Sequence, residues 1–569
     1  MNTRQSTDVS LEILWTQFES ITREMEAMLV RTAFSSGIRD AGDCSCALFD
    51  AAGRMVSQAS TAPGQMGSMP FLMAEFQRRV PAGDISDGDV FITNDPWLGC
   101  GHTPDIYVVT PIFNRGELVG YAANSGHHAD LGGRLGSQES REVYEEGLLV
   151  PLSHLHTRGV ENRELVALLR LNSRLPDELI GDLRAQMAAN HVARQRLIKL
   201  AEVHRLASGD IVAAADEIIR RSGEAMREAL AGVMPGIHRG EMLLDDFDDA
   251  GKRLEIRLAL RAEGGQIVVD FAGTSAQVAK PINSVLNYSR AYVFIGLKMA
   301  VAPALPTNAG SIACLQMVAP EGSLVNPLFP APVRWRTTVG LMLADLVLTV
   351  LAGAMPDKVI AGSGTVPRWH QVFSSRGSGR NFMLQPHFMG GMGGASAHDG
   401  LSAIAWPANL RELSIEALEQ DGPLLFLRKA FRDDSGGAGT FRGGLGEEVV
   451  VRNPKVWGNA PAQPVRATLN CGRFHEGAIG IAGGAPGARG ELIVNGKRVD
   501  RSRSEVVLQP GDEILFQTPG GGGFGPPAER DRRLVADDLD KGFISPESAR
   551  SIYGFDGDLE QGKPSLKGR

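Results

Sequence analysis

Two histidines and one aspartate in the N-terminal part of the chain have the side chains and the spacing of a metal site. Asp105 follows His102 by three positions, and His127 follows His102 by 25 positions. Two imidazoles and one carboxylate form a ligand set that suits manganese, iron or zinc. Because three protein ligands leave a coordination position for water or substrate, such a site would be catalytic. The alternative is that these are ordinary strand-end residues with hydrogen-bond partners.

A β-hairpin is expected to bring the three residues together. Apolar strand segments flank the turn at Asn114–Gly116. Pairing about this turn places residues opposite each other when their numbers add to about 231, so that Asp105 faces Gly126 and His127 faces Pro104. Since cross-strand neighbours have Cβ atoms about 5 Å apart, all three candidate ligands meet at one end of the hairpin.

His128 and Asp130 follow the last candidate ligand and are the candidate catalytic residues. Alternation along a strand points their side chains away from His127 or one repeat beyond it. From there they would fix the tautomer of a ligand histidine by hydrogen bonds.

Three cysteines near these residues allow several explanations. Cys44 and Cys46 form a C-x-C pair that could bind metal, but no second pair lies near it, which favours packing on a strand. Cys100 precedes the first candidate ligand, and it could be a fourth ligand, a reactive thiol or a packed residue.

Two glycine clusters are further candidates. Gly520–Gly525 could offer backbone N–H groups to an anion, or it could be a tight crossing of backbone segments. It is not a P-loop, because no Lys-Ser or Lys-Thr follows it. Gly390–Gly394 precedes His398 and Asp399, which could also be site residues. The chain has no Walker A sequence and no G-x-S-x-G motif, so a second chain must supply any ATP site.

The sequence around these residues predicts a multi-domain α+β protein with mixed helices and Gly-rich β-hairpin regions. Apolar periodicity predicts helices, a hairpin about Glu263–Gly265 and, after residue 420, a mainly β part with glycine turns. The helices are expected near 11–28, 161–230, 285–300 and 335–355. We expect an N-terminal α+β metal-binding region (1–240), a middle α+β region (241–420) and a C-terminal Gly-rich β region (421–569).

Composition excludes several classes of protein. The net charge is −8 and no basic patch is interleaved with aromatic residues, so nucleic acid is not an expected partner. Five irregularly spaced cysteines argue against a disulfide framework and for a reducing cytoplasm. The longest apolar run, 339–355, is short and contains Asp345, so we expect a buried helix and no membrane span.

At its motifs the sequence resembles the hydantoinase B family, which includes the C-terminal half of 5-oxoprolinases, one of the caprolactamase subunits and the acetone carboxylase alpha subunit. The resemblance runs from near residue 10 to near 554, and its motifs are highly specific when taken together. The matching stretches are Asp43–Asp50, Asn94–Pro96, His102–Asp105, Gly126–Gly133, Glu145–Gly147, Pro306–Gly310, Phe329–Val333, Asp434–Gly439, Phe441–Gly444 and Thr518–Gly525.

The resemblance implies a two-subunit, ATP-dependent enzyme. A partner of the hydantoinase A type, with an actin-like ATPase fold, would bind ATP and Mg and phosphorylate the substrate or bicarbonate. In related carboxylases a metal sits on an H-x-x-D pair and a later His, which correspond here to His102, Asp105 and His127. Two positions depart from the family pattern. Cys100 stands within the usual Gly-Gly-Thr, and Gln65 stands where a His is frequent, which leaves a proton-transfer role there in doubt.

Three functions therefore compete. The chain is the hydantoinase B-type component of an ATP-dependent hydrolase that opens hydantoin, 5-oxoproline or lactam rings, or the alpha subunit of an ATP-dependent ketone carboxylase, or a non-catalytic scaffold for the ATPase subunit. In the first function, O-phosphorylation of the amide provides a leaving group and a divalent metal (Mn, Zn or Fe) activates water. We expect a cytoplasmic hetero-oligomer of αβ pairs, and no ATPase activity from this chain alone.

Overall fold

The computed structural model describes residues 10–60, 62–134, 138–375, 382–499, 501–555 and 557. The chain forms two compact units, each made of two stretches. The first unit is Met1–Ile237 with Ala259–Arg336, and the second is His238–Leu258 with Thr337–Arg569. This division follows contacts in space, whereas the expected boundaries near 240 and 420 follow composition along the chain and stay predictions.

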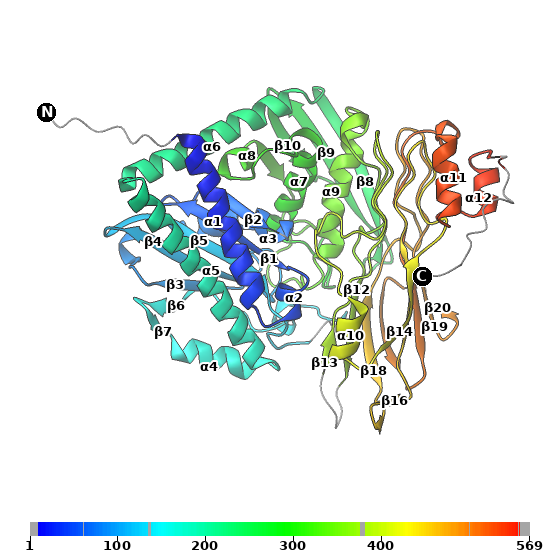
Figure 1. The fold of residues 1–569 in the computed structure, drawn as a ribbon, viewed down its shortest axis with the longest axis horizontal. Helices are drawn as coiled ribbons and strands as arrows, with labels where there is room; N and C mark the ends of the chain where they lie inside the picture. Colours follow the sequence, from blue (N-terminus) through cyan, green and yellow to red (C-terminus); the bar gives the residue numbers. More distant parts are fainter. Residues whose placement is uncertain are drawn as a thin grey trace. The chain divides into compact units, whose positions relative to one another are not determined.

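A seven-stranded antiparallel sheet organises the first unit (Figure 1). Its strand order is β2-β1-β5-β4-β3-β6-β7, so the long hairpin of β4 and β5 lies in the interior of the sheet. The strands are β1 (Cys44–Asp50), β2 (Met55–Ser60), β3 (Val90–Thr93), β4 (Asp105–Asn114), β5 (Glu117–His127), β6 (Ser153–Thr157) and β7 (Val160–Glu161).

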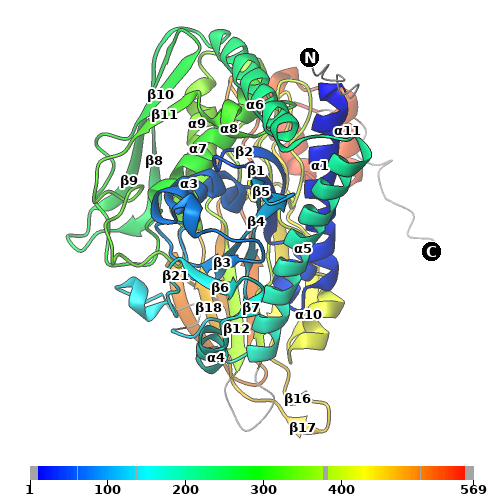
Figure 2. The same ribbon diagram turned by 90° about the vertical axis from the view of Figure 1, so that its left-hand side faces the viewer.

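Two long helices, α1 (Leu11–Thr32) and α5 (Pro176–Val203), pack side by side against this sheet (Figures 1 and 2). The apolar residues of α1 recur at helical spacing, and Phe18, Met25 and Leu29 on that face are buried in the shared core. The predicted opening helix is therefore confirmed. The other helices of the unit are α2 (Ser36–Arg39), α3 (Pro63–Arg79), η1 (Ala82–Asp84), η2 (Val143–Glu145), α4 (Arg163–Asn172), α6 (Ser208–Ala231), α7 (Leu286–Val301) and α8 (Ala309–Ile312).

A four-stranded sheet has the order β11-β10-β9-β8. β9 and β10 form the predicted hairpin, because Gly264 and Gly265 both have the positive φ that a two-residue turn requires. β11 pairs with β10 in parallel. The strands are β8 (Gly236–Phe247), β9 (Arg253–Glu263), β10 (Gln266–Asp270) and β11 (Leu315–Val318).

The second unit packs two sheets around one apolar core. Their orders are β13-β12-β18-β21 and β14-β15-β22-β19-β20, and Phe373 of the first meets Phe516 of the second with ring centroids 6.4 Å apart. The elements are α9 (Thr337–Leu351), η3 (Pro356–Lys358), β12 (His370–Ser375), β13 (Phe382–Leu384), α10 (Ile415–Asp421), β14 (Leu425–Phe431), β15 (Glu447–Arg452), β16 (Val456–Trp457), β17 (Ala460–Pro461), β18 (Val465–Asn470), β19 (Glu491–Val494), β20 (Lys497–Arg498), β21 (Arg503–Leu508), β22 (Glu513–Gln517), η4 (Pro527–Glu529), α11 (Arg532–Asp540) and α12 (Pro546–Ser551).

The most apolar helix, α9, is buried, as the sequence predicts. Its single acidic residue, Asp345, accepts hydrogen bonds from the Ser363 N–H at 3.0 Å and from the Arg473 guanidinium at 3.2 Å. These partners explain how an aspartate is accommodated in an apolar run. Among the helices of the described residues, none has the length and apolarity that crossing a membrane would require.

Glycines of the second unit pack backbone against backbone, and we call Gly520–Gly523 with its neighbours the glycine crossing. A Cβ on Gly521 would lie 2.1 Å from the Met392 carbonyl oxygen. The N–H groups of the four glycines donate to carbonyl groups of other segments, for example Gly522 to Gly362 at 2.8 Å. The tight-crossing explanation is therefore confirmed. The alternative prediction of an anion site is wrong, because the backbone N–H groups that would bind the anion already donate to carbonyl groups.

The second glycine cluster, Gly390–Gly394, belongs to the same packing. Gly394 donates to the Gly522 carbonyl at 2.9 Å, and a Cβ on Gly393 would lie 1.9 Å from the Ala361 carbonyl oxygen. Asp399 forms an ion pair with Arg530 at 2.7 Å, and the His398 ring is exposed beside the Asp399 carbonyl. These contacts favour a structural role for both side chains.

Candidate metal centre

The hairpin of β4 and β5 places Asp105 directly opposite His127. Both central residues of its turn have positive φ, as in a type I′ turn. A bulge between Ile112 and Phe113 shifts the register by one residue. The expected pairing of Asp105 with Gly126 is therefore wrong by one position, because an alternating pattern does not reveal a bulge.

The structure brings His102, Asp105 and His127 into one group. Ligand-type atoms of the three side chains all lie within 4.8 Å of one another. A single oxygen, Oδ1 of Asp105, is 3.0 Å from His102 Nε2 and 2.9 Å from His127 Nδ1. His102 and Asp105 are buried and His127 is half-buried, so the group lies at the edge of the interior.

His102 has the neutral ring and, in the described part of the chain, the nitrogen without a hydrogen bond that a metal ligand requires. Burial, together with the nearby charge of Arg336, lowers the pKa of His102 to about 3, so the ring is neutral. Its Nε2 is buried and has no hydrogen bond within the described residues. Asp105 Oδ1 lies 3.0 Å from this nitrogen. An unpaired buried nitrogen beside a carboxylate fits a site built for a cation.

The other ring nitrogen decides the tautomer of His102. Nδ1 lies 3.1 Å from the carbonyl oxygen of Arg334 and 2.7 Å from Nη1 of Arg336. The two neighbours favour opposite tautomers. The carbonyl oxygen accepts a hydrogen bond from a protonated Nδ1, whereas the guanidinium donates a hydrogen bond to an unprotonated Nδ1. A proton on Nδ1, donated to the carbonyl, leaves the lone pair of Nε2 for a metal.

Arg336 and Cys100 hold the second oxygen of Asp105. Arg336 Nη2 donates to Asp105 Oδ2 at 2.7 Å, and its guanidinium lies over the Tyr288 ring, 4.4 Å from the centroid. Burial tends to raise the pKa of Asp105, but His102 and Arg336 outweigh it and hold that pKa well below its usual range. Asp105 is therefore a carboxylate with one oxygen fixed by a cation and the other directed at the histidines.

The thiol of Cys100 acts as a hydrogen-bond donor to Asp105 Oδ2. Burial raises the pKa of this thiol well above its usual value, so it stays protonated. The cysteine also presents its carbonyl oxygen to Arg336 Nε. These contacts favour a positioning role over the reactive thiol and the fourth ligand that the sequence left open.

Gln65, near the start of α3, lies against the same group. Its Nε2 donates to Asp43 Oδ1 at 2.9 Å and approaches Asp105 Oδ1 at 3.4 Å. Its Oε1 is buried and has no hydrogen-bond partner among the described residues. This orientation of the amide is the chemically sound one, because the opposite orientation would place an oxygen against two carboxylates.

His128 and Asp130 are directed at other parts of the unit. His128 Nε2 lies 3.0 Å from Gln186 Oε1 on α5, and burial lowers the pKa of the ring. Asp130 accepts the Gly132 N–H at 3.0 Å and forms an ion pair with Arg174 at 2.7 Å. Their contacts anchor the chain after β5, and a catalytic role for either residue stays a prediction.

Residues far along the chain complete the site and escaped the sequence analysis. Arg336 lies 231 positions after Asp105. Its segment is held by Glu146, whose Oε1 accepts the N–H groups of Val333 and Arg334, each at 2.9 Å. The available signal was the motif Phe329–Val333, which ends three residues before Arg336.

Comparison with known proteins gives the context of this geometry. Residues 7–527 match the family model described as hydantoinase B/oxoprolinase. The chain belongs to the hydantoinase B/oxoprolinase family. The beta chain of caprolactamase from Pseudomonas jessenii is 30% identical over 96% of this chain and 95% of its own length. A 5-oxoprolinase of Arabidopsis thaliana is 30% identical over 91% of this chain but only 42% of its own length.

Solved structures share the fold of this family member. A crystal structure of the ATP-dependent caprolactamase from Pseudomonas jessenii matches with a TM-score of 0.86, 28% identity and 98% coverage of both chains. A nucleotide-free acetone carboxylase matches with a TM-score of 0.85 and 19% identity, covering 96% of this chain and 79% of that chain. At 19% identity, the likeness to acetone carboxylase concerns the fold alone. That fold is the predicted multi-domain α+β architecture.

Proposed function

We propose that this chain is the hydantoinase B-type component of an ATP-dependent cyclic-amide hydrolase and acts with a hydantoinase A-type, actin-like ATPase subunit. Caprolactam and 5-oxoproline, which give two relatives their names, are both cyclic amides. The observation that carries the proposal is the buried, unpaired Nε2 of His102 beside Asp105 and His127. A metal bound by these three side chains would complete the bonding of that nitrogen.

The residues present fit one divalent cation of the Mn, Zn or Fe type. His102 Nε2, Asp105 Oδ1 and His127 Nδ1 would hold it. When bound, such a metal polarises a substrate oxygen and promotes ionisation of water. Arg336 keeps Asp105 ionised and oriented, and the Arg334 carbonyl orients the His102 ring.

Gln65 is the residue we assign to the amide N–H of the substrate. Its Oε1 is a buried acceptor with no donor in the described part of the chain, and it belongs to the side chain that touches Asp105. A cyclic amide carries one N–H donor beside the carbonyl that must react. Pairing that N–H with Gln65 would satisfy the acceptor and place the carbonyl carbon beside the three ligands.

The chemistry explains the need for ATP. An unstrained amide is a poor electrophile, and transfer of the γ-phosphoryl group to its oxygen makes the ring carbon reactive. Water then adds to this carbon, and the ring C–N bond breaks with the nitrogen taking a proton. The acyl phosphate that remains reacts with a second water and releases inorganic phosphate and the open-chain acid.

A second subunit has to provide the phosphoryl donor site. This chain contains no Walker A sequence, and the 5-oxoprolinase relative is more than twice as long as the region that it shares with this chain. We therefore propose a cytoplasmic hetero-oligomer of αβ pairs in which ATP and Mg bind to the ATPase subunit.

The test is co-expression of the chain with a hydantoinase A-type ATPase subunit from the same genome. The purified complex is assayed for ATP-dependent ring opening of hydantoins, 5-oxoproline and lactams, and for carboxylation of ketones with bicarbonate. Ring opening supports the proposal, whereas carboxylation alone would make the chain a carboxylase alpha subunit. A stable complex that turns over neither group would favour the scaffold, and substrate-dependent ATP hydrolysis by this chain alone would contradict the need for a partner.

A further inference from the structure

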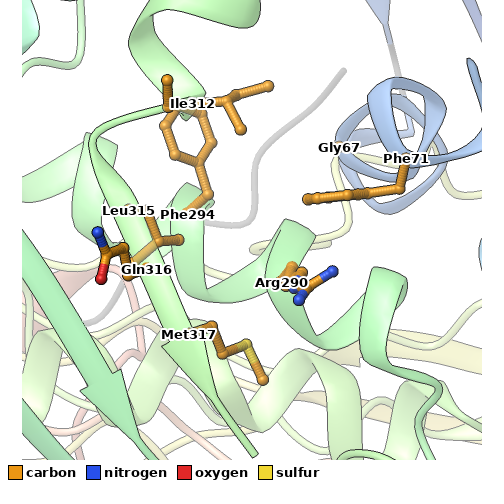
Figure 3. Close-up of a pocket in the computed structure, with 9 residues that line it drawn as sticks. Gly67, Phe71, Arg290, Phe294, Ile312, Leu315, Gln316 and Met317 are labelled. Atoms are coloured by element: carbon orange, nitrogen blue, oxygen red, sulfur yellow. The ribbon is translucent and has the colours of Figure 1, made fainter. Parts of the chain in front are cut away.

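A separate pocket of the first unit lies between α3, α7 and the segment that leads into β11 (Figure 3). Its volume is about 380 Å³, which is in the range of small-molecule sites. None of the three candidate metal ligands contributes to it. The lining residues are Gly67 and Phe71 of α3, Arg290 and Phe294 of α7, Ile312, Ala313, Leu315, Gln316 and Met317.

The lining is apolar except for one cation and one amide. Phe71 and Phe294 reach toward the space from different helices, while Leu315 and Met317 share one face of β11 (Figure 3). The Gln316 amide points away from Arg290 in this view. Among the described lining residues, Arg290 is therefore the only charged group that faces the apolar walls.

Arg290 has no polar partner in the described part of the chain to neutralise it. Its guanidinium lies over the Phe71 ring, 5.0 Å from the centroid, and the side chain forms no hydrogen bond or ion pair with the described residues. Burial lowers the pKa of Arg290, and no acidic group among those residues acts against that effect. A half-buried cation without a counter-charge is costly, so an anionic ligand would gain the interaction that the protein leaves open.

The chemistry of the lining selects the type of anion. One planar guanidinium matches one carboxylate through two parallel hydrogen bonds. A phosphate dianion normally recruits several cations or N–H donors, and the pocket offers a single cation. We infer that this pocket binds a small molecule with an apolar, aromatic body and a single carboxylate, with the carboxylate on Arg290 and the body between Phe71 and Phe294.

Close packing keeps the walls of this pocket in place. A Cβ on Gly67 would lie 2.5 Å from the Ala291 Cβ, and a Cβ on Gly64 would lie 2.6 Å from the Tyr288 ring. Helices α3 and α7 therefore touch along the glycine face of α3, which leaves the pocket preformed rather than dependent on closure. The inference does not rest on the proposed hydrolase function, since it concerns binding alone.

The test is binding of phenylacetate to the full-length protein, measured by saturation-transfer NMR and calorimetry. Phenylacetamide and benzyl phosphate are matched probes that remove the charge or replace the carboxylate by phosphate. Arg290→Met should weaken phenylacetate binding by about ten- to a hundredfold, as expected for loss of a charge-assisted pair. Arg261→Met, which removes an exposed arginine of β9, should leave the affinity unchanged.

Each outcome decides the inference. Tighter binding of phenylacetate than of both other probes, together with the loss in Arg290→Met, supports it. The inference is overturned by equal binding of phenylacetamide, by preference for benzyl phosphate, or by absence of phenylacetate binding to the wild type. If Arg290→Met does not fold, Arg290→Lys should retain weaker carboxylate binding, and the three probes on the wild-type protein still decide between a carboxylate site and the alternatives.

Discussion

The glycine crossing of the second unit and the candidate metal centre of the first unit are both dense groups of small and polar residues. They differ in which buried polar atoms have no hydrogen-bond partner among the described residues. At the crossing, the N–H groups of Gly520–Gly523 all donate to carbonyl groups. At the candidate metal centre, the buried atoms Nε2 of His102 and Oε1 of Gln65 have no hydrogen-bond partner among the described residues.

This difference separates two uses of burial. A buried group that is fully paired contributes to the fold and offers nothing to a ligand. A buried group that is left unpaired costs free energy, and a ligand that completes the pairing recovers that cost on binding. We therefore expect substitutions at the crossing to change stability, and substitutions at the centre to change binding and turnover.

The largest effect is expected for His102→Ala in the complex with the proposed ATPase subunit. Loss of one of three ligands should lower ATP-dependent turnover by about 10³-fold, because metal activation contributes several kcal/mol. Steady-state assays measure this loss, and His191→Ala, which removes an exposed histidine of α5, is the matched control. If His102→Ala kept more than a tenth of wild-type turnover, the expectation that substitutions at the candidate metal centre lower turnover would be contradicted.

Gly521→Ala tests the expectation that substitutions at the glycine crossing change stability. The new Cβ would lie 2.1 Å from the Met392 carbonyl oxygen, so the crossing must open and the free energy of unfolding should fall by about 2–4 kcal/mol. Urea unfolding measures the change. Gly353→Ala is the control, because nothing lies within 4 Å of its Cβ, and it should stay within about 0.5 kcal/mol. Equal stability of the two variants would argue against a tightly packed crossing.

Glu146 is an intermediate case, since both of its oxygens accept hydrogen bonds but its carboxyl group is buried. Burial raises the pKa of Glu146 to about 8. Below about pH 4.5 the carboxyl is protonated in both states, and at higher pH the unfolded chain ionises first, so stability falls as pH rises toward 8. In Glu146→Gln this loss should disappear, with a slope difference of at most about 1.4 kcal/mol per pH unit.

Unfolding measured from pH 5 to pH 8 tests this expectation. Glu145→Gln, one position away and partly exposed, should keep the wild-type pH profile. Parallel profiles for Glu146→Gln and the wild type would show that Glu146 is ionised in the folded protein.

The smallest effect is expected for Gln65→Ala. Removing the unpaired acceptor should lower kcat/KM for an N–H lactam by about tenfold, as for loss of one hydrogen bond. The N-methylated lactam cannot donate to Gln65, so its kcat/KM should change little. An equal loss for both lactams would assign Gln65 to positioning of Asp43 and Asp105 rather than to the substrate.

Local patterns account for the part of this structure that the sequence predicts. The helical spacing in α1, the glycine turn of the β9–β10 hairpin and the clustering of the three candidate ligands all depend on residues close in sequence. The cluster was predicted even though the pairing was displaced by one residue, because the end of a hairpin tolerates that error.

Contacts between distant segments account for what was missed. The bulge at Ile112 and Phe113 depends on packing around the strand and leaves no mark in the apolar alternation. Arg336 reaches Asp105 from a segment whose backbone N–H groups donate to Glu146, and no local pattern encodes such a contact. The glycine crossing was open between two explanations until its hydrogen-bond partners were known.

The central claim is that His102, Asp105 and His127 hold one divalent metal. Elemental analysis of the purified complex of this chain with the proposed ATPase subunit tests it most directly, in the wild type, His102→Ala and His191→Ala. We predict about one equivalent of Mn, Zn or Fe per chain in the wild type and His191→Ala, and a loss of that equivalent in folded His102→Ala. A wild-type complex without stoichiometric metal, or a His102→Ala complex that retains it, would contradict this claim.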